Sequence, residues 1–133
     1  MKTILFFLLS LSSFLSFGQT YEAHLDAARK CINEGKTEDA IIQFEKALQY
    51  NEQGFDAHFE LGRVLVQKGE AKKAIRHLTA AIALNKPYGG SYFYMGNAYE
   101  LLGEQVNACR YWKKAVELGE KQAQSTIDEK CKS

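Results

Sequence analysis

Apolar residues recur with helical spacing through most of the chain, most clearly between residues 55 and 88. Two apolar stripes flank Gly69 there: Phe59, Leu61, Gly62, Leu65 and Val66, then Ala74, Ile75, Leu78, Ala81 and Ile82. Steps of three, four and seven residues place each stripe on one face of a helix. A glycine between them favours a left-handed residue at a helix end. The pattern predicts two helices of about 14 residues each, joined by a short turn.

The pattern repeats with a period of 34 residues, which defines three units at residues 21–54, 55–88 and 89–122. Four sets of small residues share this register: Gly35, Gly69 and Gly103; Ala40, Ala74 and Ala108; Ala47, Ala81 and Ala115; and Ala28, Gly62 and Gly96. We expect the two helices of a unit to approach closely at the eighth and twentieth positions. The twenty-fourth position is large each time, and it fills the remaining space with Phe44, Leu78 and Trp112. A further helix over residues 123–131, polar except at Ala123 and Ile127, would cap the last apolar face.

Two short motifs in this register resemble the tetratricopeptide repeat (TPR) family. The third unit has the W-x2-L-G-x2-Y element as Tyr92, Met95, Gly96 and Tyr99, and the first has the A-x3-F element as Ala40 and Phe44. The resemblance covers residues 21–122 and implies an all-α fold, a right-handed α-solenoid of three helix-turn-helix units plus a C-terminal capping helix. The first helix of unit one departs most from the motif. The family's proline occurs once, at Pro87, shifted by one position.

TPR arrays commonly bind peptides along a concave face formed by the first helix of each pair. Position by position, the resemblance implies an apolar row flanked by polar residues in this groove: Leu25, Phe59, Phe93 and Ile127, with Arg29, Arg63, Asn97 and Tyr94. Such a surface suits a segment of a partner polypeptide. The alternative is that the phenylalanines pack between helices and the arginines pair with Asp26 and Glu60 on their own helices. The lysine-asparagine-arginine clamp that grips chaperone C-termini is missing, since Leu25, Gly90 and Tyr94 stand at its positions.

Residues 1–18 have the pattern of a cleavable signal peptide. Lys2 precedes an uncharged, mostly apolar stretch from Ile4 to Phe17, which is too short to span a bilayer comfortably. Small residues at Ser16 and Gly18 predict cleavage before Gln19 and a mature domain of residues 19–133. The protein is therefore expected to be exported, periplasmic or secreted. It is not expected to be a lipoprotein, because no cysteine follows the cleavage site.

Export permits a disulfide, and the three cysteines allow at most one intramolecular pair. If the chain reverses near Gly119, an antiparallel hairpin brings Cys109 and Cys131 level. A bond between them would add about 3 kcal/mol of stability on a chain-entropy estimate. The alternative is two unpaired thiols. Cys31 occupies a core position and is read as a small apolar filler.

Charge and motifs exclude several functions. The formal net charge of +1 offers no field for nucleic acid, and no metal-binding, phosphate-binding or hydrolase motif is present. His24 and His58 share one repeat position, but core histidines are commoner than a metal pair, and His77 is predicted at the helix surface. Ser91 is a candidate N-cap. The sequence predicts a non-enzymatic interaction module of the bacterial cell envelope that needs no cofactor and no small-molecule substrate. The alternative is a fixed structural subunit of an outer-membrane or secretion complex.

Overall fold

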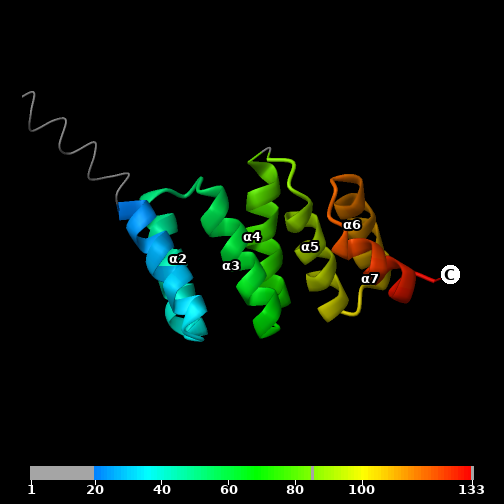
Figure 1. The fold of residues 1–133 in the computed structure, drawn as a ribbon, viewed down its shortest axis with the longest axis horizontal. Helices are drawn as coiled ribbons and strands as arrows, with labels where there is room; N and C mark the ends of the chain where they lie inside the picture. The colour runs from blue at the N-terminus through cyan, green and yellow to red at the C-terminus, as the bar shows by residue number, and fades with distance from the viewer. Residues whose placement is uncertain (1–19, 85, 133) are drawn as a thin grey trace, which may run out of the picture. The chain divides into compact units, whose positions relative to one another are not determined.

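The computed structural model describes residues 20–84 and 86–132, and these residues form seven helices and no strand (Figure 1). A first helix covers residues 20–33. Six more follow: α2 (Thr37–Tyr50), α3 (Phe55–Lys68), α4 (Ala71–Ala83), α5 (Gly89–Leu101), α6 (Gln105–Glu117) and α7 (Gln122–Lys130). The predicted all-α helical repeat is confirmed. The predicted signal peptide and its cleavage site before Gln19 lie outside the described residues.

Glycine ends the first helix of each pair. Gly35, Gly69 and Gly103 have φ values of 75°, 85° and 74°, in the left-handed region that only glycine adopts at low cost. At Gly69 the backbone N–H donates to Val66 O at 3.0 Å, and the next N–H donates to Leu65 O at 2.9 Å. This is the Schellman pattern, which satisfies carbonyls that the ending helix leaves open. The same pair of bonds recurs at Gly35, Gly103 and, before α7, Gly119.

The chain divides into two compact units, Met1–Ala57 and His58–Ser133. The core of the first contains Leu25, Ala28, Ala40, Phe44 and Ala47, all buried. In the second, α4 packs on α5, α5 on α6, and α6 on α7. Its largest fully buried side chains are Trp112, Leu61, Leu78 and Met95. Each unit therefore contains buried apolar residues from the stripes that the sequence pattern predicted.

The second unit confirms the close helix approach predicted at the eighth repeat position. A Cβ added to Gly62 would lie 2.6 Å from Leu78 Cγ, and one added to Gly96 would overlap the indole of Trp112. The indole Nε1–H donates to Asn97 Oδ1 at 2.9 Å. Small residues at position eight thus make room for the large residue at position twenty-four, and packing rather than backbone conformation selects glycine here.

The C-terminal helix α7 covers the end of the repeat array. Ala123 is fully buried in a cluster with Phe93, Ala108, Trp112 and Ala115, and Ile127 packs against that cluster. Cys109 and Cys131 form the predicted disulfide, which closes a loop with a sequence separation of 22. None of the described helices combines the length and apolar character that crossing a bilayer requires.

Two local predictions were wrong. Ser91 is not an N-cap: α5 begins two residues earlier, at Gly89, and the Ser91 side chain is buried without a hydrogen-bond partner. Helix formation extends through both glycines because Gly89 packs closely against Glu120 and the Ala115 carbonyl, where a side chain would collide. His77 is not a surface residue, since it is half-buried against His58.

Candidate functional site

An aromatic cluster lies on the first helices of the second unit. Its members are Phe59 on α3, Tyr88 just before α5, and Phe93 and Tyr94 on α5. The ring of Phe59 meets that of Tyr88 edge-on at a centroid distance of 4.9 Å and that of Tyr94 at 5.9 Å. Phe93 meets Tyr94 at 5.4 Å, also edge-on. These contacts have the T-shaped geometry that aromatic quadrupoles favour, so the cluster is held in a defined arrangement.

Exposure differs sharply among the four rings. Phe93 retains 6% of its accessible surface, Phe59 and Tyr94 are half-buried, and Tyr88 is 43% exposed. The cluster therefore has a buried base and a solvent-facing edge formed by two tyrosines and Phe59. Exposed aromatic rings on a rigid support are typical anchors for a partner segment.

Two residues expected in the apolar row of the groove are not available to a partner. Leu25 retains 1% of its surface in the core of the first unit, and Phe93 forms the base described above. The prediction that Leu25 or Phe93 contacts a partner segment directly is wrong, because each of these side chains is buried within the packing of its own helices. Tyr88 was missed. Its only signal in the sequence was its position between Pro87 and the glycines that start α5.

Two of the polar residues predicted beside the groove, Arg29 and Asn97, have partners within the chain. Arg29 forms ion pairs with Asp26 at 4.0 Å and Asp56 at 3.6 Å, as the alternative reading expected for the first of these. Asn97 accepts the Trp112 indole hydrogen bond and so supports the core. Arg63 is half-buried on α3, one turn beyond Phe59. Ile127 packs into the C-terminal cluster and belongs to the capping contact.

A second row of side chains joins the two helices of each repeat. His24 and Gln43 are linked by a hydrogen bond of 2.7 Å between Nδ1 and Oε1. One repeat later, His58 Nδ1 lies 3.2 Å from His77 Nδ1. Two repeats later, the rings of Tyr92 and Tyr111 lie 6.3 Å apart. Burial, with His58 and Arg76 nearby, lowers the pKa of His77 to about 4. At neutral pH the His77 ring is thus uncharged.

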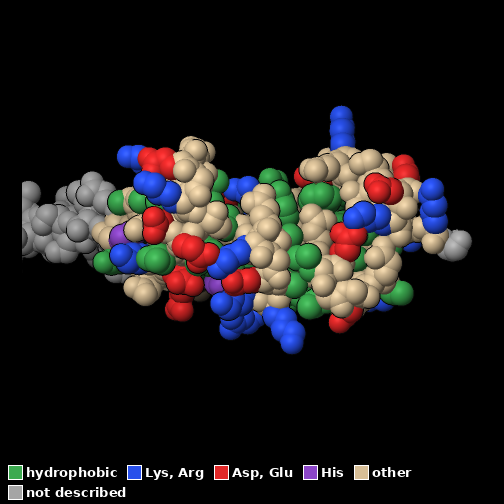
Figure 2. Space-filling view, turned by 90° about the horizontal axis from the view of Figure 1, so that it is seen from below, with side chains coloured by type: hydrophobic (Ala, Val, Ile, Leu, Met, Phe, Trp, Pro, Cys, Tyr) green, Lys and Arg blue, Asp and Glu red, His purple; other side chains and the backbone are tan. Residues whose placement is uncertain are grey.

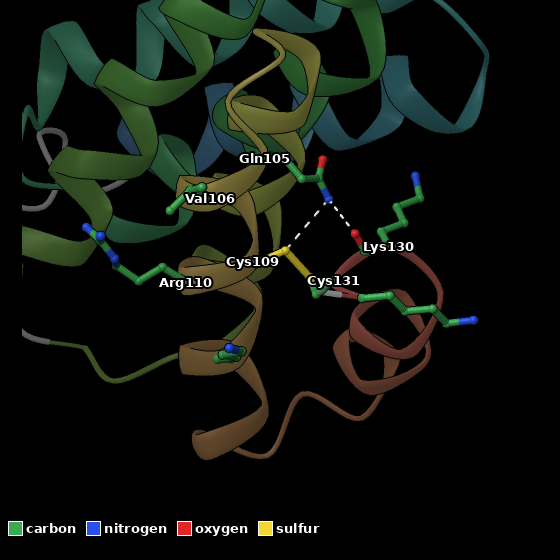
Figure 3. Close-up of a pocket in the computed structure, with 8 residues that line it drawn as sticks. Gln105, Val106, Cys109, Arg110, Lys130 and Cys131 are labelled. Carbon is green, nitrogen blue, oxygen red and sulfur yellow. Dashed lines mark hydrogen bonds between the residues drawn. A yellow bond between two sulfur atoms is a disulfide. The ribbon is translucent and has the colours of Figure 1, made fainter.

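A basic pocket of about 420 Å³ lies between α6 and α7 (Figure 3). Its lining includes the Cys109–Cys131 disulfide and four cationic side chains: Arg110, Lys113, Lys130 and Lys132. The Gln105 amide donates to Lys130 O at 2.9 Å and to Cys109 Sγ at 3.7 Å, which ties the last turn of α7 to α6. Sequence reasoning found the disulfide but not the pocket.

Possible metal sites were sought among the residues that the structure describes. Between residues 20 and 84 and between 86 and 132, no group of three or more His, Cys, Asp or Glu side chains is placed to hold a metal ion. The histidine pair has two ligands, whereas protein zinc sites use three or four.

The geometry is that of a helical repeat protein in which antiparallel helix pairs recur every 34 residues. Residues 28–69 match a family model described as TPR repeat, and residues 55–88 match one described as tetratricopeptide repeat. The chain is a tetratricopeptide repeat protein. No curated protein sequence matches it significantly.

Solved TPR structures resemble the fold closely. The first TPR domain of Spaghetti (RPAP3), bound to the HSP90 peptide SRMEEVD, superposes with a TM-score of 0.79 at 18% identity, covering 84% of this chain and 90% of that chain. The second TPR domain of human RPAP3, in complex with the HSP70 peptide SGPTIEEVD, gives 0.81 at 20% identity, covering 88% and 99%. The MamA protein gives 0.70 at 30% identity, and this chain covers 58% of its length. The likeness shows that the fold is that of a TPR domain.

Proposed function

We propose that this protein is an exported interaction module of the bacterial cell envelope, which holds a segment of another polypeptide against its aromatic cluster. The observation that carries the proposal is the solvent-facing edge of that cluster, formed by Phe59, Tyr88 and Tyr94. Such rings offer large apolar contact area at little cost in conformational entropy. Solved TPR domains with bound peptides support the same mode of use.

The chemistry of the surface indicates what kind of segment would fit. The edge is aromatic, with two phenol hydroxyls and the Arg63 guanidinium one turn away on α3. A segment with an apolar side chain for the rings and a hydrogen-bond acceptor or carboxylate for Arg63 satisfies both features. The chaperone carboxylate clamp is not proposed, because its residues are absent from the first-helix positions.

Export is supported by the N-terminal sequence and by the disulfide. Structural disulfides form and persist in oxidising compartments, and the Cys109–Cys131 bond fixes the capping helix. Mass spectrometry of the protein isolated from its own cells tests this directly. A mature N-terminus at Gln19 in the envelope fraction is the expected result, whereas intact Met1 in the cytosolic fraction would refute export.

Crosslinking and co-purification from the envelope test the interaction. We expect the wild type to capture a partner and the Phe59→Ala/Tyr94→Ala variant to lose it by at least about tenfold, since central aromatic anchors contribute roughly 2 kcal/mol or more each. Tyr92→Ala is the matched control, because Tyr92 lies on the same helix but packs against Tyr111. Equal capture by the wild type and the double variant would place the contact elsewhere. A partner released only by dissolving a membrane complex would favour the fixed structural subunit.

A further inference from the structure

The pocket between α6 and α7 has an unusual charge distribution. Four of its eight lining residues are cationic, and none is a carboxylate. Val106, at 76% exposure, adds an apolar side chain at its edge. Of the four cations, Lys130 already pairs with Glu100 across the helices. Arg110, Lys113 and Lys132 add positive charge around an exposed apolar spot, a combination that suits an acidic surface with an apolar centre.

The pocket is held open by covalent and polar contacts. The disulfide fixes the end of α7 beside α6, and Gln105 bridges the Lys130 carbonyl and Cys109 Sγ, as Figure 3 shows. A surface that is already ordered loses less entropy on binding.

The chain itself carries the complementary charge. Residues 20–57 contain 4 basic and 8 acidic side chains, a net charge of −4, whereas residues 58–133 contain 12 basic and 8 acidic, a net charge of +4. Opposite ends of one sequence thus carry opposite charge although the whole chain is near neutral. On the face shown in Figure 2, acidic and basic side chains are interspersed with small apolar patches.

Equivalent positions of the first and third repeats also differ in charge. On α2, exposed Asp39 and Glu45 flank Ile42, which is 48% exposed. The residues 68 positions later, at the same places in the repeat on α6, are Asn107, Lys113 and Arg110. On α2 of the first repeat, acidic side chains therefore surround the apolar Ile42. On α6 of the third repeat, basic side chains lie beside the apolar Val106.

We propose that a second copy of this chain occupies the pocket, with the α2 face of one copy docked on the α6–α7 pocket of the other. Ile42 meets Val106, and Asp39 and Glu45 meet Arg110, Lys113 and Lys132. Residues 1–19 contain no acidic side chain, so that segment lacks the charge to fill the pocket. The contact joins two different faces, so two copies can close reciprocally or further copies can add head to tail. It uses residues of α2 and α6 with Lys132 after α7, and none of these belongs to the aromatic cluster.

Sedimentation velocity of the purified protein from about 1 to 200 µM tests the pairing. We expect association in 50 mM salt that weakens by about tenfold or more in 500 mM salt, because exposed charge pairs are screened. Arg110→Glu/Lys113→Glu and Asp39→Lys/Glu45→Lys should each abolish association. Lys72→Glu/Arg76→Glu, an equal charge change on α4, should leave it intact.

Mixing the two interface variants separates lost contact from lost fold. Each variant retains one original face that matches the original face of the other, so the 1:1 mixture should regain association. A single chain with all four substitutions should also regain it, because both faces are reversed together. A monomeric wild type at 200 µM in low salt would overturn the proposal. So would variants that associate like the wild type, or a pocket that binds an acidic partner from the envelope while the protein stays monomeric.

Discussion

The first and third helix pairs follow the same repeat positions but distribute volume differently. In the first pair Ala28 and Phe44 are both fully buried, whereas in the third the equivalent residues are Gly96 and Trp112. The smaller residue accompanies the larger partner. Between the first and third pairs, the smaller residue at one position offsets the larger residue at the other, so the helices of both pairs approach closely.

The two ends also differ in how they are secured. The last helix pair is covered by α7, which the Cys109–Cys131 bond attaches to α6. In the first pair, the contacts between helices include the His24–Gln43 hydrogen bond and the ring stacking of His24 on Tyr50 at 5.6 Å. The covalent bond restricts the unfolded chain as well as the folded one. We expect opening of the C-terminal end to depend on redox state.

Removing the disulfide should have the largest effect. Cys131→Ser should lower the free energy of unfolding by about 3 kcal/mol, because the unfolded chain regains the entropy of a loop spanning 22 positions. Urea denaturation measures the change, and hydrogen exchange should show faster opening of α7. Cys31→Ser, at the free half-buried cysteine, is the control and should change stability far less. An unchanged urea midpoint for Cys131→Ser would mean that packing alone holds the cap.

A smaller effect is expected from placing the alanine of the first helix pair at the equivalent position of the third pair, next to Trp112. Gly96→Ala should destabilise by about 1–2 kcal/mol, because overlap with the Trp112 indole outweighs the gain in helix propensity of about 1 kcal/mol. In a Trp112→Phe background the same substitution recreates the Ala–Phe pairing of the first repeat. There it should be neutral or stabilising. A double-mutant cycle by urea denaturation gives the coupling, and additive effects would contradict the volume argument.

Much of the fold was predictable because it depends on local patterns with a fixed period. The glycine turns, the helix pairs and the tight contact of Gly62 with Leu78 each follow from residue size and spacing. The start of α5 could not be predicted in this way, because burial of Gly89 against Glu120 overrides the weak helix propensity of two glycines. Tertiary packing, which a single sequence does not display, decided that boundary.

The candidate site was less predictable than the fold. Transfer by repeat position placed Phe59 and Phe93 in one apolar row with Tyr94 beside it, but Phe59 and Tyr94 are half-buried whereas Phe93 is buried. Phe93 is buried because α7 and α6 close over it, and the extent of that cover depends on the cap helix. Tyr88 lies outside the regular helix, so helical periodicity gave no reason to place its ring beside Phe59.

The smallest expected effect is the change in the free energy of unfolding when His77, which lies beside His58, takes up a proton. His77 has its pKa lowered to about 4 by burial and by the neighbouring His58 and Arg76. Because the unfolded chain binds this proton near the ordinary value of 6.5, the native state loses stability as pH falls from about 6.5 towards 4. Partial solvent exposure screens the effect, so we expect a loss of about 1 kcal/mol or less. Above pH 6.5 both states leave the ring neutral and no difference remains.

The first repeat supplies the variant that isolates this proton. His77→Gln gives the second repeat the His–Gln pair found at His24 and Gln43, so the variant should lose less stability than the wild type between pH 7 and pH 4.5. Gln43→His makes the reverse change and should introduce the same dependence into the first repeat. Urea denaturation of all three proteins at both pH values gives the comparison, and the carboxylates titrate alike in each and cancel. If the wild type and His77→Gln lose the same stability between pH 7 and pH 4.5, protonation of His77 does not destabilise the fold, and the prediction is wrong.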